Sequence, residues 1–129
     1  MVKNVFDEKL VARFPFYCWL DEYGNKRTAS FWIGEGWLEL LLTMSLAIEE
    51  QLTQMSSLDT TSFAIYEVKE KYGGMRIDFS GSPNRDIGKL IRQAEEDSFN
   101  VCEECGHPGR IRDVRSWITV LCDLCNEKQ

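Results

Sequence analysis

The sequence predicts an α+β protein: a small antiparallel sheet built from hairpins and packed with two helices, followed by a C-terminal ribbon that holds zinc through four cysteines. Three observations predict this class. Residues 63–80 alternate like two strands around a glycine turn, residues 37–55 and 84–98 have helical apolar spacing, and two Cys-x-x-Cys pairs stand near the end. For a chain of 129 residues we expect an α+β domain over residues 1–100 and a zinc ribbon over residues 101–129 docked on it.

The first third of the chain is rich in strand-forming aromatic residues. Residues 14–20 (FPFYCWL) and residues 27–33 (RTASFWI) flank the turn-rich DEYGN, which predicts a hairpin. Gly34-Glu35-Gly36 then ends the strand before a helix over residues 37–55. The apolar stripe of this helix consists of Leu38, Leu41, Leu42, Ser45, Ala47, Ile48 and Leu52.

A second hairpin is predicted from FAIYEVKEKY and MRIDFS. Gly73-Gly74 stands between them and can supply the positive φ angles of a tight turn. In the following helix Ser82 is the predicted N-cap and Pro83 the first helical residue. The helical apolar positions are Ile87, Leu90, Ile91, Ala94 and Ser98.

Composition excludes several classes. The longest apolar stretch is interrupted by polar residues, and the N-terminus has no signal core, so we expect neither a membrane protein nor a secreted one. The expected location is the cytoplasm, where paired cysteines favour metal over disulfides. The net charge is −6, and residues 1–60 hold five Lys and Arg against nine Asp and Glu. This acidity argues against binding nucleic acid through phosphates alone and suits a basic protein partner.

Cys102-x2-Cys105-x16-Cys122-x2-Cys125 has the spacing of a structural zinc site, with two disulfides or a redox pair as the alternatives. Four thiolates would close the metal's coordination, whereas a catalytic zinc keeps one position open. His107, the one histidine, is therefore expected in a loop rather than as a ligand. A single histidine also argues against an HNH-type nuclease, which needs several, and the chain lacks the H-x-E motif that a zinc deaminase has before its P-C-x-x-C.

Other candidate residues are open to two interpretations. Arg110, Arg112, Arg115 and Trp117 could contact phosphates and bases, or they could form the solvated face of a strand and pack the ribbon on the last helix. Lys69, Lys71 and Arg76 could form a binding surface, or the lysines could protect an edge strand.

Cys18 is expected to be a small buried hydrophobe, because no histidine lies near it in sequence. The remaining aromatic residues are expected in the core, with part of the set exposed for an interface. They are Phe14, Phe16, Tyr17, Trp19, Phe31, Trp32 and Trp37.

Three stretches resemble an uncharacterised family of small proteins from bacteria and their phages: GEGWLELL, VKEKYGGMRIDFSG and AEEDSFNVCEECGHPGRIR…W…LC…C. Members read G-x-G-W, K-E-K-F-G-G-L-R and C-E-x-C-G-x-P-G-R, often with histidine where this chain has Cys125. The resemblance covers residues 34–125 and implies a zinc-bearing α+β domain. The finger alone is also similar to DksA/TraR-type proteins, which bind RNA polymerase, but this chain lacks their long coiled coil.

The sequence thus favours a non-enzymatic zinc-ribbon protein that binds another protein, in one version a mobile-element-encoded modulator or inhibitor of a host system. One alternative is a nucleic-acid-binding ribbon with a role in transcription. The other is an enzyme with an unrecognised carboxylate site, which a deep cleft lined by paired carboxylates would support.

Overall fold

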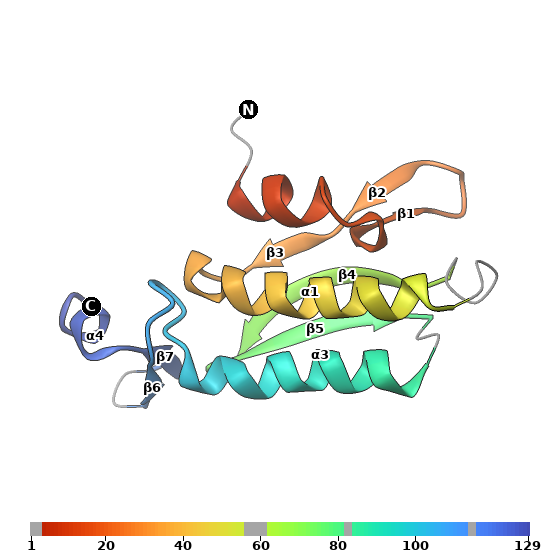
Figure 1. Cartoon of the computed structure of the whole chain (residues 1–129). Helices are drawn as coiled ribbons and strands as arrows, with labels where there is room; N and C mark the ends of the chain where they lie inside the picture. Colours follow the sequence, from red (N-terminus) through yellow and green to blue (C-terminus); the bar gives the residue numbers. More distant parts are fainter. Residues whose placement is uncertain (1–3, 56–61, 82–83, 114–115) are drawn as a thin grey trace.

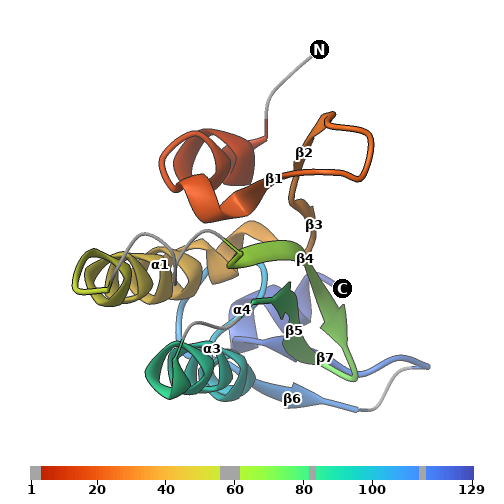
Figure 2. The ribbon, with the colours of Figure 1, turned by 90° about the vertical axis from the view of Figure 1, so that its right-hand side faces the viewer.

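The computed structural model describes residues 4–55, 62–81, 84–113 and 116–129. It confirms the α+β class: helices α1 (Leu38–Thr53) and α3 (Arg85–Asp97) lie side by side on one face of a three-stranded sheet, and the ribbon follows α3 (Figures 1 and 2). Among the described residues, no helix combines the length and the apolar character needed to span a membrane.

The central sheet has the order β3 (Ser30–Trp32), β4 (Ala64–Lys71), β5 (Gly74–Ser80). The antiparallel β4–β5 hairpin was predicted. The pairing of β3 with β4 is parallel, so the sheet is mixed rather than wholly antiparallel. The physical reason is the connection, because α1 carries the chain from one end of the sheet back to the other and the next strand then starts in the same direction.

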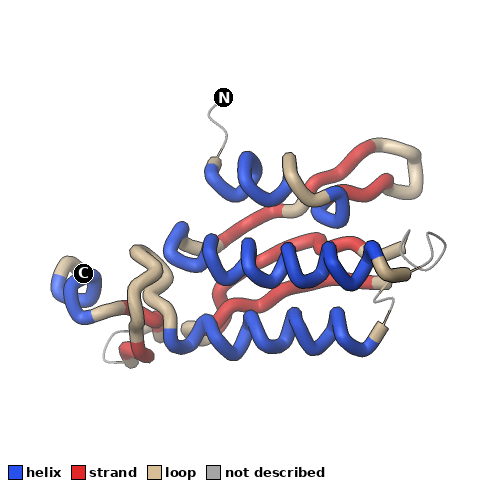
Figure 3. Tube along the Cα trace, viewed as in Figure 1, coloured by secondary structure: helices blue, strands red, loops and turns tan. Residues whose placement is uncertain are grey.

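The predicted N-terminal hairpin is shorter than its sequence pattern. Only β1 (Cys18–Leu20) and β2 (Lys26–Thr28) pair, in a separate two-stranded sheet. The aromatic residues before β1 belong instead to helical turns, η1 (Asp7–Val11) and η2 (Pro15–Tyr17), visible as the upper helical segments of Figure 3. Pro15 stands at the first position of η2, where its fixed φ and missing N–H favour a helical turn over a strand.

Helix α1 begins one residue after the predicted start at residue 37, and α3 begins at Arg85, two residues after the predicted first helical position. A 3₁₀ turn, η3 (Glu35–Trp37), precedes α1. The N-cap of α3 is Asn84, whose side chain accepts a hydrogen bond from the Ile87 amide; the predicted Ser82 and Pro83 lie outside the described residues. A second 3₁₀ turn, η4 (Ser98–Asn100), ends α3.

The β4–β5 turn lies one residue earlier than predicted. Lys71 pairs with Gly74, so the turn residues are Tyr72, with φ of 54°, and Gly73, with φ of 92°. Gly74 belongs to β5, and the ring of Phe99 packs directly on it: a Cβ there would lie 2.2 Å from Phe99 Cζ. The second glycine is therefore needed for packing rather than for the turn.

The outer edge of β5 is closed by side chains of α3 and η4. The Met75 amide donates to Ser98 Oγ at 2.8 Å, and the Ile77 amide donates to Glu95 Oε2 at 2.9 Å. These two amides would otherwise face a buried edge without a partner.

The core lies between the sheet, the helices and the N-terminal turns. Its largest fully buried side chains include Trp37, Tyr17 and Phe14, and the Tyr17 hydroxyl hydrogen-bonds to Ser45 Oγ at 2.6 Å. The ribbon adds β6 (Arg110–Arg112), β7 (Thr119–Leu121) and α4 (Asp123–Glu127), with β6 and β7 antiparallel.

Candidate metal centre

Four cysteines meet where the ribbon begins and ends. Cys102 and Cys105 lie in the loop after η4, Cys122 lies between β7 and α4, and Cys125 lies on α4. Their sulfur atoms all lie within 4.8 Å of one another, and the Sγ atoms of Cys105 and Cys122 are 3.5 Å apart. All five cysteines of the chain are free thiols. The four clustered sulfurs can therefore hold a metal ion.

Backbone hydrogen bonds shape the two Cys-x-x-Cys loops. The Gly106 amide donates to the Cys102 carbonyl at 2.9 Å, and Gly106 has a φ of 83° that favours glycine. In the second loop Cys122 is the N-cap of α4, and its Sγ accepts a hydrogen bond from the Cys125 amide at 3.4 Å. Amides that point at sulfur favour the thiolate form, which is the form that binds metal.

The acidity of the thiols differs across the cluster. Burial raises the pKa of Cys102, but hydrogen bonds from three backbone amides outweigh burial and lower that pKa to about 7. These amides belong to Cys122, Cys105 and Glu104. The pKa of Cys125 is raised, first by the hydrogen bond of its thiol with Cys122. The Cys102 thiol thus ionises most readily, whereas the Cys125 thiol stays protonated and hydrogen-bonded within the cluster. A divalent cation bound by the four sulfurs would let the other thiols ionise as well.

His107 is an exposed loop residue, and its ring still approaches the cluster. Its Nδ1 lies 3.2 Å from Cys105 Sγ, and its carbonyl accepts a hydrogen bond from the Cys102 amide at 2.8 Å. A protonated Nδ1 at this distance can donate to the sulfur of Cys105.

The first Cys-x-x-Cys loop is bound directly to the G-E-G-W segment before α1. The Gly36 amide donates to the Glu103 carbonyl at 2.7 Å, and the Gly34 amide donates to Glu103 Oε2 at 2.9 Å. Trp37 Nε1 donates to the Val101 carbonyl at 2.8 Å. These bonds cross the domain boundary predicted at residue 100, and the division itself stays a prediction.

Both glycines of this segment are required by the close approach. A Cβ on Gly36 would lie 2.2 Å from the Cys102 carbonyl oxygen, and a Cβ on Gly34 would lie 2.4 Å from that of Glu103. Burial raises the pKa of the Glu103 carboxyl. Sequence reasoning missed this contact, although the joint occurrence of G-x-G-W and C-E-x-C in one set of motifs was a signal for it.

Arg112 belongs to the interior of the ribbon. It is only 9% exposed, which corrects the interpretation that it lies on a solvated strand face. Its Nε and Nη2 donate to the Leu121 carbonyl at 3.1 and 3.0 Å, and Nη2 also donates to Asp123 Oδ1 at 2.8 Å. The hydrogen bond from Arg112 lowers the pKa of Asp123. Arg110 and Arg112 lie two positions apart on β6 and so share a face of the strand; Arg112 is buried because its guanidinium is held against the Leu121 carbonyl, whereas Arg110 is exposed.

The other predicted contact residues of the ribbon are dispersed. Arg110 is exposed, 3.6 Å from Asp123, and Arg115 lies outside the described residues. Trp117 is 59% exposed, so the prediction that it packs the ribbon on the last helix is wrong.

The lysines of β4 do not protect an edge strand, because β4 is the middle strand of its sheet. Lys69 Nζ lies 3.4 Å from Glu67 and 3.6 Å from Asp78, so its charge is balanced on the solvent face. Lys71 and Arg76 are exposed.

Cys18 lies in β1, half-buried and away from the other cysteines, so it is less enclosed than predicted. Of the seven aromatic residues expected in the core, four are buried and two are partly buried in it, while Trp32 is 69% exposed. The buried four are Phe14, Phe16, Tyr17 and Trp37.

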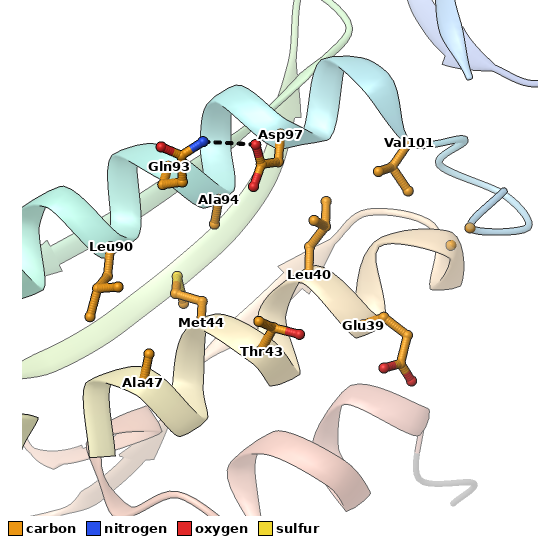
Figure 4. A pocket seen from close by; sticks show the side chains of 12 residues that line it. Glu39, Leu40, Thr43, Met44, Ala47, Leu90, Gln93, Ala94, Asp97 and Val101 are labelled. Carbon is orange, nitrogen blue, oxygen red and sulfur yellow. Dashed lines mark hydrogen bonds between the residues drawn. The ribbon is translucent and has the colours of Figure 1, made fainter. Parts of the chain in front are cut away.

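Figure 4 shows the hollow between α1 and α3, which has a volume of about 270 Å³. Apolar side chains such as Leu40 and Leu90 dominate its lining. Its two carboxylates do not face each other: Glu39 points away from α3, and Asp97 accepts a hydrogen bond from Gln93 at 2.8 Å. The hollow therefore lacks the arrangement needed for general acid–base catalysis.

Comparisons of this chain with models of protein families, with curated proteins and with solved structures gave no match. The resemblance inferred from its motifs therefore stays a prediction.

Proposed function

We propose that this chain is a zinc-ribbon protein whose metal has a structural role and whose function is to bind another protein. The observation that carries the proposal is the cluster of four sulfurs within 4.8 Å of one another. A tetrahedron with Zn–S bonds of about 2.3 Å has edges of about 3.8 Å, which matches sulfurs this close together. Four thiolates saturate zinc, so the ion would stabilise the fold without catalysing a reaction.

The ribbon depends on this ion because its own apolar cluster is small. That cluster contains Cys102, Leu121 and Cys125, with Cys122 packed against it. Such a cluster buries too little apolar area to fold alone, and structural zinc supplies the missing stabilisation in domains of this kind.

Binding to another protein is favoured by the exposed aromatic side chains near the ribbon, Tyr72 and Trp117. Both residue types often anchor protein interfaces. In the most concrete version of this proposal, the protein is encoded by a mobile element and modulates or inhibits a host protein in the bacterial cytoplasm.

Nucleic-acid binding is the weaker candidate, since the two arginines predicted for it that the structure describes do not form one free basic face. Arg112 is engaged inside the ribbon and Arg110 lies beside Asp123. The net charge of −6 also opposes a polyanion.

Two measurements test the proposal. Protein purified without added metal is expected to contain one zinc per chain by elemental analysis. The tagged protein is also expected to capture one specific bacterial protein, recovered in stoichiometric amount after nuclease treatment. Absence of metal together with disulfide-linked cysteines in mass spectrometry contradicts the structural role. Recovery of nucleic acid without a protein contradicts the binding role.

A further inference from the structure

The turn between β4 and β5 meets the ribbon, as Figure 2 shows, and large apolar side chains are exposed where they meet. A Cβ on Gly73 would lie 2.8 Å from Ile118 Cγ2, and Phe99 packs on the next glycine, so both side chains border the turn. Tyr72 precedes Gly73 in the chain and Trp117 precedes Ile118, and both of these aromatic side chains are exposed. We name this face the turn–ribbon surface; its apolar members are Tyr72, Phe99, Trp117 and Ile118.

Tyr72 occupies a backbone conformation that suits other residues better. Its φ of 54° lies in the left-handed region, where glycine and asparagine are favoured. The ring is 73% exposed, and Lys71 Nζ lies over it, 5.8 Å from the ring centroid. Because the fold gains little from this ring, its strained position suggests a role outside the fold.

Cations border the apolar side chains. A hollow of about 280 Å³ beside Phe99 is lined by Lys71, Arg76 and Arg92, and none of these three forms an ion pair within the described part of the chain. Of the carboxylates nearby, Glu70 accepts a hydrogen bond from the Gly73 amide, and Glu95 accepts one from the edge of β5. Glu96 also lines the hollow, so three cations stand against two carboxylates, of which Glu95 is already engaged by the β5 amide. The hollow is therefore a locally basic border of the apolar side chains in an acidic protein.

We propose that the turn–ribbon surface binds a segment of another protein in which carboxylate side chains flank large apolar ones. The inference rests on the proposed protein-binding function and names its surface and the chemistry of its partner. Apolar groups of the segment pack on Tyr72 and Trp117, and its carboxylates pair with Lys71, Arg76 and Arg92. A nucleic-acid strand fits less well, because a protein of net charge −6 with Glu95 and Glu96 beside these cations tolerates a segment with few carboxylates better than a chain of successive phosphates.

Selection of peptides tests this chemistry directly. The full zinc-loaded chain is used to select from a displayed library of short random peptides. We expect enriched peptides to combine Asp or Glu with Leu, Ile, Phe or Trp. The best peptide is then labelled, and its affinity for the protein is measured by fluorescence anisotropy. Tyr72→Asn and Trp117→Ser are each expected to weaken binding about tenfold or more, the loss typical of an interface anchor.

The controls separate binding from folding. Tyr23→Asn changes a tyrosine that is 80% exposed in the β1–β2 turn and is expected to leave the affinity unchanged. Tyr72→Asn is expected to raise the thermal unfolding midpoint while it weakens binding, since it relieves the backbone strain. If Tyr72 had only a structural role, the substitution would lower both the unfolding midpoint and the affinity for the peptide.

Several outcomes overturn the proposal: no enrichment, enrichment of basic peptides, or equal binding by wild type and both variants. Single-stranded oligothymidine that binds more tightly than any peptide and is lost in the same variants assigns the surface to nucleic acid instead. Self-association in sedimentation that both variants abolish assigns it to a second copy of the chain. If the two variants still capture the bacterial partner at full yield, the protein-binding function stands and this surface is excluded from it.

Discussion

The α+β part of the molecule buries Trp37, Tyr17 and Phe14 in one extensive apolar cluster, whereas the ribbon's own cluster is little more than Cys102, Leu121 and Cys125. The first part can be stabilised by apolar burial, which contributes about 25 cal/mol for each Å² removed from water. We propose that the second part relies on a bound metal. The two parts are bonded backbone to backbone at Glu103, so we expect loss of a bound metal to affect the start of α1 as well.

Removal of a metal ligand is expected to have the largest effect. Cys102→Ser should abolish metal binding and with it a free energy on the order of 10 kcal/mol, as in zinc-finger peptides. Elemental analysis and circular dichroism during heating measure the result, and hydrogen exchange at the Gly36 amide should become faster. Cys18→Ser is the matched control, because Cys18 lies outside the cluster and its substitution should leave the metal content unchanged. A Cys102→Ser protein that retains metal and its unfolding midpoint would contradict the assignment.

Glycine substitution tests the contact between the two parts. In Gly36→Ala the new Cβ would overlap the backbone of Cys102 and Glu103, which cannot move aside as a side chain can. Overpacking of this kind costs about 1–3 kcal/mol or more of unfolding free energy. Gly88→Ala on α3 meets nothing within 4 Å and should stabilise the protein by about 0.5–1 kcal/mol. Urea unfolding compares the two variants; equal stability would show that the contact is unimportant.

Substitution of the two arginines of β6, Arg110 and Arg112, tests how the interior of the ribbon is stabilised. Arg112→Ala leaves the Leu121 carbonyl and Asp123 without their donor and should lower the unfolding free energy by about 1.5–3 kcal/mol. Arg110→Ala removes an exposed, weakly paired side chain and should have little effect. If both substitutions have the same effect on stability, Arg112 does not hold the ribbon together.

The smallest effect is expected at the surface of the α+β part. Arg13 Nη1 and Nη2 donate to Glu49 at 2.6 and 3.0 Å, and this hydrogen bond lowers the pKa of Glu49. The bond therefore stabilises the fold above the unfolded-state pKa of Glu49, and its contribution is lost as the pH falls through the lowered folded-state pKa. Glu49→Gln should lower the unfolding midpoint slightly at neutral pH and not at all near about pH 2. A difference that persists in acid has another cause.

The sequence predicted those elements whose pattern is set by local physics. Period-two alternation identified β5, helical spacing identified α1 and α3, and the spacing of Cys102 to Cys125 identified the metal cluster. The all-antiparallel sheet was wrong because strand direction depends on which neighbour β3 finds after the helical crossover, which no local pattern encodes. The strand expected over residues 14–17 was wrong because aromatic residues pack equally well from a helical turn.

Side-chain roles within the site were less accessible to sequence reasoning. Arg112 and Arg110 share one face of the same short strand, and the contacts of the Arg112 guanidinium with Leu121 and Asp123, which no sequence pattern encodes, make one internal while the other is exposed. The roles of Glu103 and Phe99 likewise depend on glycines far away in the chain.

The hydrogen bonds from β5 to Ser98 and Glu95 have a consequence for self-assembly. Growth of a fibre by strand addition requires two open edges on every sheet, one to receive a strand and one to offer the next. Here the amides of Met75 and Ile77 already donate sideways to a helix, so only the β3 side can accept a strand. Strand addition to the central sheet would therefore end with a dimer. The chain can expose aromatic side chains without forming a fibre through this sheet.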